Sequence, residues 1–266
     1  MKGNMDQRLI IERKGFVACL TLHHPEKRNA LTPELLRAIQ INLETFSKKD
    51  DVRCVVIRGS GDTVFSSGYD IAAIPVGQSP GMRQETPEVL LGALEAVKKF
   101  PYPTIAMLNG HAFGAGFNLC ACCDIRIAAG DVRMGMTPAR LGVAYHPDGI
   151  QQFIEAFGMA RTKEIFYTAQ TFQGQDLLQK GLVNHLVPRA DLEAFTLAYA
   201  EKITRNAPLS LKGIKNIIGL FEKNTALNPA DLEAADQWIQ TCFQSNDLKE
   251  GRAAFMEKRT PEFTGK

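Results

Sequence analysis

Long hydrophobic runs are missing from this chain of 266 residues, and no apolar stretch reaches the length of a membrane-spanning helix. Residues 1–8 also lack the apolar core of a secretory signal peptide, so we expect a cytoplasmic protein. An excess of one charge is missing too, because the formal net charge is only +2. Charge therefore gives no reason to expect a membrane or a nucleic acid as a partner.

A metal-binding pattern is also absent. Most of the six cysteines lie in apolar runs, which is typical of reduced, buried thiols. Cys120, Cys122 and Cys123 are crowded on one turn, and no matching Cys/His pair is near, so we expect no zinc site. Internal repeats and low-complexity tracts are missing as well. The length allows one large domain or two small ones.

The patterns that are present alternate between strand and helix. Lys14-Gly15 predicts a hairpin turn, and Thr32 followed by Pro33 predicts the cap and first position of a helix. A second amphipathic helix is predicted for 87–99, after a loop at 75–86 that is rich in Gly, Pro and Ser. The chain is mostly helical beyond 150. The runs that predict strands are 9–13, 16–22, 54–57, 104–108, 125–129 and 182–187. This order favours an α/β body followed by a helical C-terminal part.

The stretch 109–124 organises the α/β body. It follows a predicted strand, holds Gly110, Gly114 and Gly116, and then becomes small and apolar, as in a buried helix. A strand, a glycine turn and a helix start direct backbone N–H groups to a point where negative charge can sit. The spacing matches neither the dinucleotide motif nor the P-loop. Taken alone, the stretch predicts either a tight turn before a helix or an anion site.

Two further segments carry candidate functional residues. Residues 64–74 predict a strand, a turn and a helix start. Residues 133–149 are apolar and poor in helix formers, yet they contain Tyr145, His146 and Asp148. Long irregular segments inside a compact domain are often functional.

Several separated runs resemble the crotonase (enoyl-CoA hydratase/isomerase) superfamily. Phe-Ser-Ser-Gly-Tyr-Asp-Ile at 65–71 and Asn-Gly-His-Ala-Phe-Gly-Ala-Gly at 109–116 are similar to its two active-site turns. Lys-Arg-Asn-Ala-Leu at 27–31 is similar to its CoA-binding segment, and 180–183 and 255–263 also fit. The resemblance implies a spiral of ββα units over 1–200, and a helical trimerisation and CoA-capping region over 201–266. It also implies a homotrimer or a dimer of trimers.

The resemblance further implies an oxyanion hole for an acyl-CoA thioester. By position, the N–H groups of Tyr69 and Ala115 would hold the thioester oxygen and stabilise an enolate. The helix that Ala115 opens would add its dipole. No cofactor is expected beyond the CoA moiety, and no metal. The residues that the resemblance places at the CoA site are Lys27, Arg28, Ala30, Ser67, Asp70, Ile71 and Gly114, with Phe255 and Lys258 closing its adenine end from a neighbouring subunit.

Two acids of the family's hydratases are missing. The resemblance places Asn118 and Pro138 where those enzymes carry glutamates, and neither side chain can exchange a proton in hydration. Decarboxylation of a malonyl-type thioester needs no base, and a nearby carboxylate would repel the substrate's own. Residues 136–145 and 255–263 resemble the superfamily's methylmalonyl-CoA decarboxylases, in which a tyrosine hydrogen-bonds the substrate carboxylate. That role would fall to Tyr145, although those enzymes have His and Glu in place of Tyr69 and Asn118.

Several of these residues have alternative roles. Tyr145 could be a core tyrosine, and Asn118 could bind either the substrate acid or the local backbone. His146 could be a loop residue, a second donor or a proton source, and Asp148 an acid or part of an Asp-Gly turn. Lys27 and Arg28 could be solvated rather than bound to CoA phosphates, where arginine makes bidentate contacts. Structural roles are expected for Asp70, as a helix cap, and for Asp124.

The functional alternatives differ in class. The second hypothesis, beside the decarboxylase, is a hydratase, isomerase or hydrolase that uses His146 or Asp148 in place of the glutamates. A non-enzymatic CoA-binding or RNA-binding homologue is the third hypothesis, and the weak net charge argues against RNA.

Overall fold

Two sheets run through the α/β body of the computed structural model, which describes residues 8–69, 85–141, 145–223 and 244–266, and residues 230, 233, 234, 237 and 241. The larger sheet has the strand order β1-β2-β3-β5-β7-β10, and the smaller one β4-β6-β8-β9. The strands are β1 (Leu9–Lys14), β2 (Val17–Leu22), β3 (Cys54–Gly59), β4 (Val64–Ser66), β5 (Thr104–Leu108), β6 (His111–Phe113), β7 (Ile125–Ala129), β8 (Arg133–Gly135), β9 (Thr171–Gln173) and β10 (His185–Val187).

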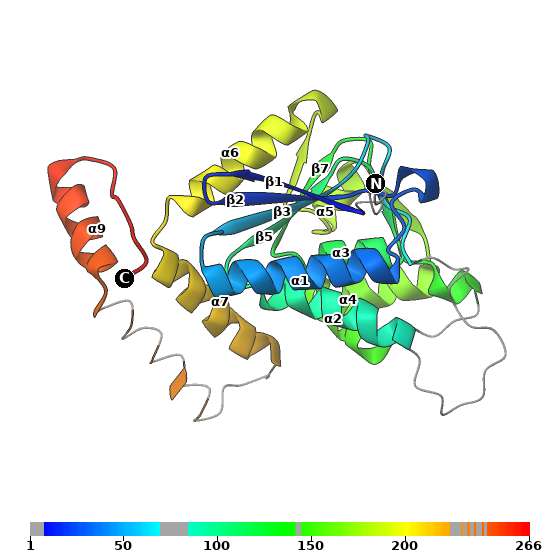
Figure 1. The fold of residues 1–266 in the computed structure, drawn as a ribbon. Helices are drawn as coiled ribbons and strands as arrows, with labels where there is room; N and C mark the ends of the chain where they lie inside the picture. Colours follow the sequence, from blue (N-terminus) through cyan, green and yellow to red (C-terminus); the bar gives the residue numbers. More distant parts are fainter. Residues whose placement is uncertain are drawn as a thin grey trace, which may run out of the picture.

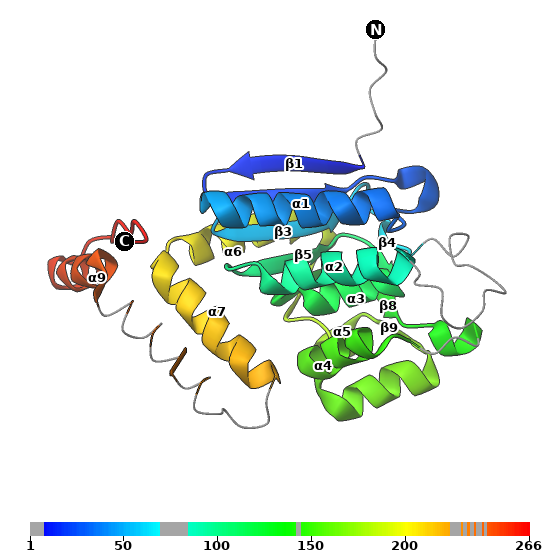
Figure 2. The same ribbon diagram turned by 60° about the horizontal axis from the view of Figure 1, so that its bottom comes forward.

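Helices cover both faces of the larger sheet. In Figure 1, α1, α2 and α3 lie on one face and α6 on the other, while α7 and α9 lie to one side of the body. Figure 2 shows α4 beyond α3. The helices are α1 (Pro33–Lys49), α2 (Glu85–Lys99), α3 (Ala115–Cys122), α4 (Pro147–Thr168), α5 (Gln175–Gln179), α6 (Leu192–Thr204), α7 (Pro208–Lys223) and α9 (Asn246–Glu257), and the short 3-10 turns are η1 (Pro25–Lys27), η3 (Pro138–Leu141) and η4 (Arg189–Asp191).

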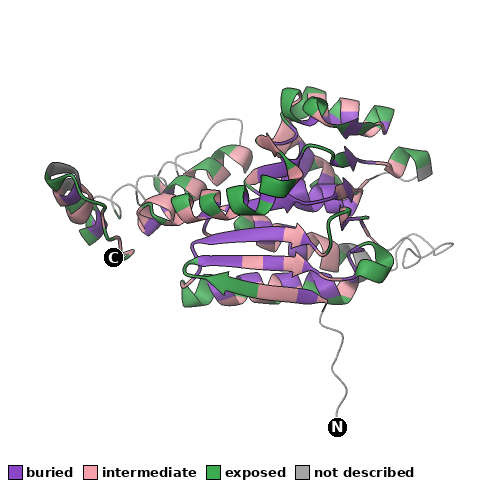
Figure 3. Ribbon diagram, turned by 90° about the horizontal axis from the view of Figure 1, so that it is seen from above, coloured by how far each residue is buried: buried purple, intermediate pink, exposed green. Residues whose placement is uncertain are grey.

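The fold repeats one unit. Three strands of the larger sheet each continue, after a short turn, into a strand of the smaller sheet and then into a helix: β3-β4-α2, β5-β6-α3 and β7-β8-α4. This repetition agrees with the predicted spiral of ββα units. β2, β3, β5, β7 and β10 pair in parallel, and all of β5 is buried, as a strand covered by helices on both faces should be. Figure 3 shows the inner strands largely buried and the second half of β1 exposed.

Local sequence signals explain the first elements. β1 and β2 pair antiparallel around Gly15, whose φ of +56° suits glycine, so the predicted hairpin is confirmed. Thr32 caps α1, because its Oγ1 accepts a hydrogen bond from the N–H of Leu35, and Pro33 is the first helical residue, as predicted.

Three predictions of local structure need correction. The loop predicted for 75–86 is wrong at its end, because α2 begins at Glu85; residues 75–84 and the helix start expected at 70–74 lie outside the described residues. Residues 133–149 are not irregular throughout, since they contain β8, η3 and the start of α4. The Asp148-Gly149 pair forms the first turn of α4 rather than a loop turn, because Pro147 fixes the backbone at its first position.

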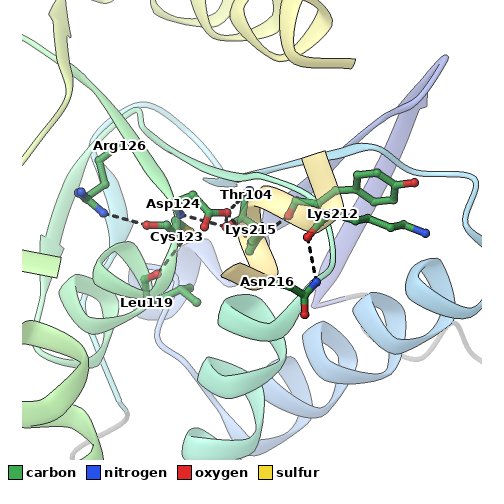
Figure 4. A network of polar contacts seen from close by, with 9 residues as sticks. Thr104, Leu119, Cys123, Asp124, Arg126, Lys212, Lys215 and Asn216 are labelled. Carbon is green, nitrogen blue, oxygen red and sulfur yellow. Dashed lines mark hydrogen bonds and ion pairs between the residues drawn. The ribbon is translucent and has the colours of Figure 1, made fainter. Parts of the chain in front are cut away.

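Asp124, just after α3, has the structural role that was predicted. Its Oδ2 accepts hydrogen bonds from the backbone N–H of Thr104 (2.6 Å) and from the Thr104 hydroxyl (2.9 Å). The same oxygen binds Nζ of Lys215 at 2.6 Å (Figure 4). Lys215 lies on α7 and also donates to the carbonyl of Tyr102, so this contact joins α7 to the body.

Burial raises the pKa of the thiols of Cys54, Cys120, Cys122 and Cys123, which are free in the structure. Among the described residues, no group of three or more His, Cys, Asp or Glu side chains could hold a metal ion. No helix in the described part of the chain has the length and apolarity needed to cross a membrane.

Candidate active site

The two glycine turns meet at the ends of β4 and β6, which are parallel neighbours in the smaller sheet. Gly68, with a φ of +99°, follows β4 and packs against the start of α3. A Cβ atom at Gly68 would lie 2.7 Å from the carbonyl oxygen of Phe113 and 3.2 Å from the backbone nitrogen of Ala115. Only glycine allows this approach, so the sequence places the backbone around 69 and 115 side by side.

The N–H of Tyr69 points toward the start of α3. The carbonyl of Gly68 accepts a hydrogen bond from the N–H of Leu31 at 2.8 Å. In a trans peptide unit the N–H points opposite to the carbonyl, so the N–H of Tyr69 is directed away from Leu31. β6 and α3 lie on that opposite side.

Ala115 supplies the second N–H. It is the first residue of α3, so its N–H has no acceptor within the helix. The preceding Gly114 has a φ of +52° and serves as the N-cap. Since every residue of α3 is buried, the positive end of the helix dipole acts in a medium that screens it weakly. The two N–H groups and the helix end can together bind an oxygen that carries negative charge.

The predicted CoA-binding segment lies directly beside the Gly68 turn. The N–H of Ser67 donates to the carbonyl of Arg28 at 3.0 Å, and the Ser67 hydroxyl donates to the carbonyl of Lys27 at 3.2 Å. Lys27, Arg28 and Ser67 are exposed, while Ala30 is buried. The buried amide of Asn29 fixes the segment, because its Nδ2 donates to the carbonyls of Ser60 and Val64.

A second set of polar groups lies one helical turn beyond the two N–H donors. Asn118 is three residues after Ala115 and therefore on the same face of α3. The Tyr145 hydroxyl donates to Oδ1 of Asn118 at 2.8 Å, and Nδ2 of Asn118 donates to Oε1 of Gln152, on α4, at 2.7 Å. Asn118 is fully buried and Gln152 nearly so. The hydrogen-bond partners of Asn118's side chain within the described residues are Tyr145, Gln152 and the Cys122 sulfur, and none of them is a carboxylate.

The surroundings of these groups disfavour charge. Burial, and then the nearby Cys122, raises the pKa of the Tyr145 phenol above its usual range, so the hydroxyl stays protonated at neutral pH. The Tyr69 hydroxyl is buried and has no hydrogen-bond partner among the described residues. Unpaired buried polar atoms are rare, so this hydroxyl either costs stability or is available to a ligand.

His146 and Asp148 face solvent at the start of α4. Nδ1 of His146 accepts the N–H of Asp148 at 3.3 Å, which makes His146 the N-cap of the helix. The same nitrogen lies 3.7 Å from the Asp148 carboxylate, and the two side chains are 48% and 64% exposed. Neither makes a hydrogen bond to the Tyr145–Asn118 pair.

Other predicted residues lie apart from this site or outside the described chain. α9, which carries Phe255, lies at the opposite end of the molecule from η1, the short dark-blue turn in Figures 1 and 2. Lys258 follows α9 and is exposed. The side chain of Phe255, and all of Asp70 and Ile71, lie outside what the structure describes.

Sequence reasoning missed Gln152 and the close-contact role of Gly149. Gln152 lies 34 residues from Asn118, and no motif marks it. A Cβ atom at Gly149 would lie 2.3 Å from Cε1 of Tyr145, so the absent side chain makes room for the tyrosine ring. A glycine that directly follows an acidic residue suggested only a turn.

Comparisons with known proteins identify the family and the fold of this chain. The family model described as enoyl-CoA hydratase/isomerase matches residues 12–266. A methylmalonyl-CoA decarboxylase of Escherichia coli (strain K12) is 32% identical, over 94% of this chain and 95% of the relative. A short-chain-enoyl-CoA hydratase of Clostridium acetobutylicum is 30% identical, over 96% of each chain.

Solved structures give the same result for the fold. The crystal structure of an enoyl-CoA hydratase from Bacillus anthracis superposes with a TM-score of 0.90 at 29% identity, and the match covers 98% of this chain and 100% of the other. The predicted crotonase-like fold is therefore confirmed.

Proposed function

The chain belongs to the enoyl-CoA hydratase/isomerase family, within the crotonase superfamily, and from this premise we propose that it decarboxylates a malonyl-type acyl-CoA thioester such as methylmalonyl-CoA. The observation that carries the proposal is the buried amide of Asn118, hydrogen-bonded to Tyr145, one turn from the N–H of Ala115. An amide there neither repels a substrate carboxylate nor acts as a general acid or base toward water.

The proposed reaction needs little beyond the oxyanion hole. The bond between the α-carbon and the carboxylate breaks, its electron pair moves into the thioester to form the enolate, and neutral CO2 leaves. The N–H groups of Tyr69 and Ala115 hold the negative enolate oxygen, and a single donor of this kind is typically worth about 10²–10³ in kcat. A proton from water then reaches the α-carbon. Tyr145 holds the carboxylate before it leaves.

CoA would reach this site along the 27–31 segment, which Ser67 contacts. The exposed side chains of Lys27 and Arg28 lie beside the Gly68 turn and suit the phosphates of CoA. Phe255 and Lys258 lie at the other end of the same chain, so a contribution from them would require another copy of the protein. We therefore propose an oligomer, and the resemblance to the family favours a trimer or a dimer of trimers.

The test is CO2 release from malonyl-CoA and methylmalonyl-CoA. We expect Tyr145→Phe to lower kcat/KM about tenfold or more, because a hydrogen bond to a charged group contributes about 1.5–3 kcal/mol. Tyr167→Phe is the matched control, since Tyr167 is 78% exposed and should retain full activity. Full activity in Tyr145→Phe would remove this residue from the mechanism, and no turnover on any malonyl-type thioester would reject the reaction class.

Enoyl-CoA hydration or isomerisation is the second candidate, because relatives named hydratases match at nearly the same identity as the decarboxylase. His146 or Asp148 would have to turn from solvent toward the substrate, since both are exposed at the N-terminus of α4. Hydration of crotonyl-CoA and isomerisation of a 3-enoyl-CoA decide between the candidates. Activity that is lost in His146→Ala and retained in Tyr145→Phe would favour the second.

A further inference from the structure

The Tyr145 hydroxyl has one hydrogen, and the structure shows where it goes. It is donated to Oδ1 of Asn118 at 2.8 Å, in a site where Asn118 is fully buried. A phenol cannot donate the same hydrogen to a second strong acceptor at once. A substrate carboxylate that binds Tyr145 must therefore take the hydrogen from Asn118.

We propose that Asn118 competes with the substrate carboxylate for the phenolic hydrogen of Tyr145, and that this competition weakens carboxylate binding before CO2 leaves. The inference rests on the proposed function and assigns Asn118 a part in it. Asn118 is a positioning residue here, because it acts on the substrate through Tyr145.

Gln152 and Gly149 keep the Asn118 amide and the Tyr145 ring in this arrangement. Oε1 of Gln152 accepts from Nδ2 of Asn118 at 2.7 Å, so the amide is fixed with its oxygen toward Tyr145. Gly149 leaves room for the tyrosine ring, because a Cβ atom would lie 2.3 Å from Cε1 and 3.0 Å from Oδ1 of Asn118. Gln152 is therefore a second positioning residue.

The consequence for the reaction follows from the change in charge. An ionised carboxylate is a stronger acceptor than an amide oxygen, so the bound substrate takes the hydrogen and leaves the buried oxygen of Asn118 unpaired. When the carbon–carbon bond breaks, the carboxylate becomes neutral CO2, which is a poor acceptor. The hydrogen then returns to Asn118. The unpaired oxygen of Asn118 raises the free energy of the bound substrate complex, and the transition state regains part of the lost hydrogen bond. This difference raises kcat rather than tightening binding.

The test uses two CoA thioethers that cannot react. S-(2-carboxyethyl)-CoA carries the carboxylate but lacks the thioester carbonyl, and S-propyl-CoA has the same chain length without the charge. Calorimetric titration gives the affinity of each analogue. The ratio of the affinity for S-(2-carboxyethyl)-CoA to that for S-propyl-CoA isolates the contribution of the carboxylate contact. Asn118→Leu removes the competing acceptor, so we expect the ratio to shift about fivefold in favour of the carboxylate analogue, the equivalent of one net hydrogen bond.

Tyr145→Phe is the control that tests whether Asn118 acts through the Tyr145 hydroxyl. In that background Asn118→Leu should give no gain, because no phenolic hydrogen remains to be released. On malonyl-type thioesters, Asn118→Leu should lower KM and kcat together, whereas a residue that only supports the fold would leave KM unchanged or raise it. A ratio that stays the same or falls in Asn118→Leu, or a gain that survives in Tyr145→Phe, would overturn the inference.

A second variant covers the case in which Asn118→Leu does not fold. Gln152→Met removes the acceptor that orients the Asn118 amide, so the amide can rotate and free the Tyr145 hydrogen. We expect the ratio to shift about twofold or more in the same direction, while the neighbouring Gln151→Met, on an exposed side chain, leaves it unchanged. An unchanged ratio in Gln152→Met would also overturn the inference. Since binding needs no turnover, these ratios are independent of whether CO2 is released.

Discussion

Adding one methyl group at Gly68 should damage the reaction much more than the fold. Gly68→Ala would place a Cβ atom 2.7 Å from the carbonyl oxygen of Phe113 and 3.2 Å from the backbone nitrogen of Ala115. Relief of the first contact requires the two turns to separate by roughly 0.7 Å, to ordinary van der Waals distance. That movement separates the N–H groups of Tyr69 and Ala115, which we propose hold the thioester oxygen.

A misplacement on the order of 1 Å can cost about 100-fold in rate, or about 2.7 kcal/mol of activation free energy. The backbone strain of a side chain at positive φ adds about 1–2 kcal/mol to the loss of stability. Gly61→Ala separates the two effects. Gly61 has a φ of +73° and open space around its Cβ position, so this variant carries the strain without the crowding.

The assay is kcat for CO2 release from methylmalonyl-CoA, beside thermal unfolding of both variants. We expect Gly61→Ala to lose a few degrees in Tm and little activity. Gly68→Ala should lose at least as much in Tm and about 100-fold in kcat. A kcat for Gly68→Ala within threefold of that for Gly61→Ala would refute the oxyanion-hole assignment.

Three further predictions test the surroundings of the site. Asp124→Asn weakens the contact with Lys215, so the free energy of unfolding should fall by about 2 kcal/mol and lower Tm, with activity per folded molecule retained; an unchanged Tm would contradict the structural role. Burial raises the pKa of Cys54 and Cys123 to about 12, so at pH 8 about one of these thiols in 10⁴ is ionised. Ellman's reagent should reach Cys54 and Cys123 only after denaturation, and rapid labelling of either residue in a folded variant that lacks Cys242 and the half-buried Cys19 would count against their burial. Tyr69→Phe removes a buried hydroxyl that has no partner among the described residues, so the free energy of unfolding should stay the same or rise and kcat should be maintained; a loss of stability of more than about 1 kcal/mol would show that the hydroxyl is paired.

The sequence predicted the elements whose signals are local. Gly15, Thr32 and Pro33 act on their immediate neighbours, so the hairpin and the start of α1 follow from residue type alone. Asp124 was predicted to be structural from its place just after a helix, although nothing in the sequence indicated Lys215 as its partner. That contact spans 91 residues and depends on how α7 packs.

The candidate site was predictable where motifs mark it and not where packing creates it. The turns that contain Gly68 and Gly114 have characteristic residues, and the structure brings them together. Gln152 is one polar residue on a long helix, and only the packing of α4 against α3 directs it toward Asn118. Gly149 follows an acidic residue, which is typical of a turn, so its contact with Tyr145 could not be foreseen.

The measurement that tests the central claim most directly is a crystal structure with propionyl-CoA bound. Our account predicts that the thioester oxygen lies about 3 Å from the backbone nitrogens of both Tyr69 and Ala115, with the α-carbon facing Tyr145 and no acidic side chain over it. A thioester oxygen turned away from these two nitrogens, or a carboxylate positioned at the α-carbon, would contradict it.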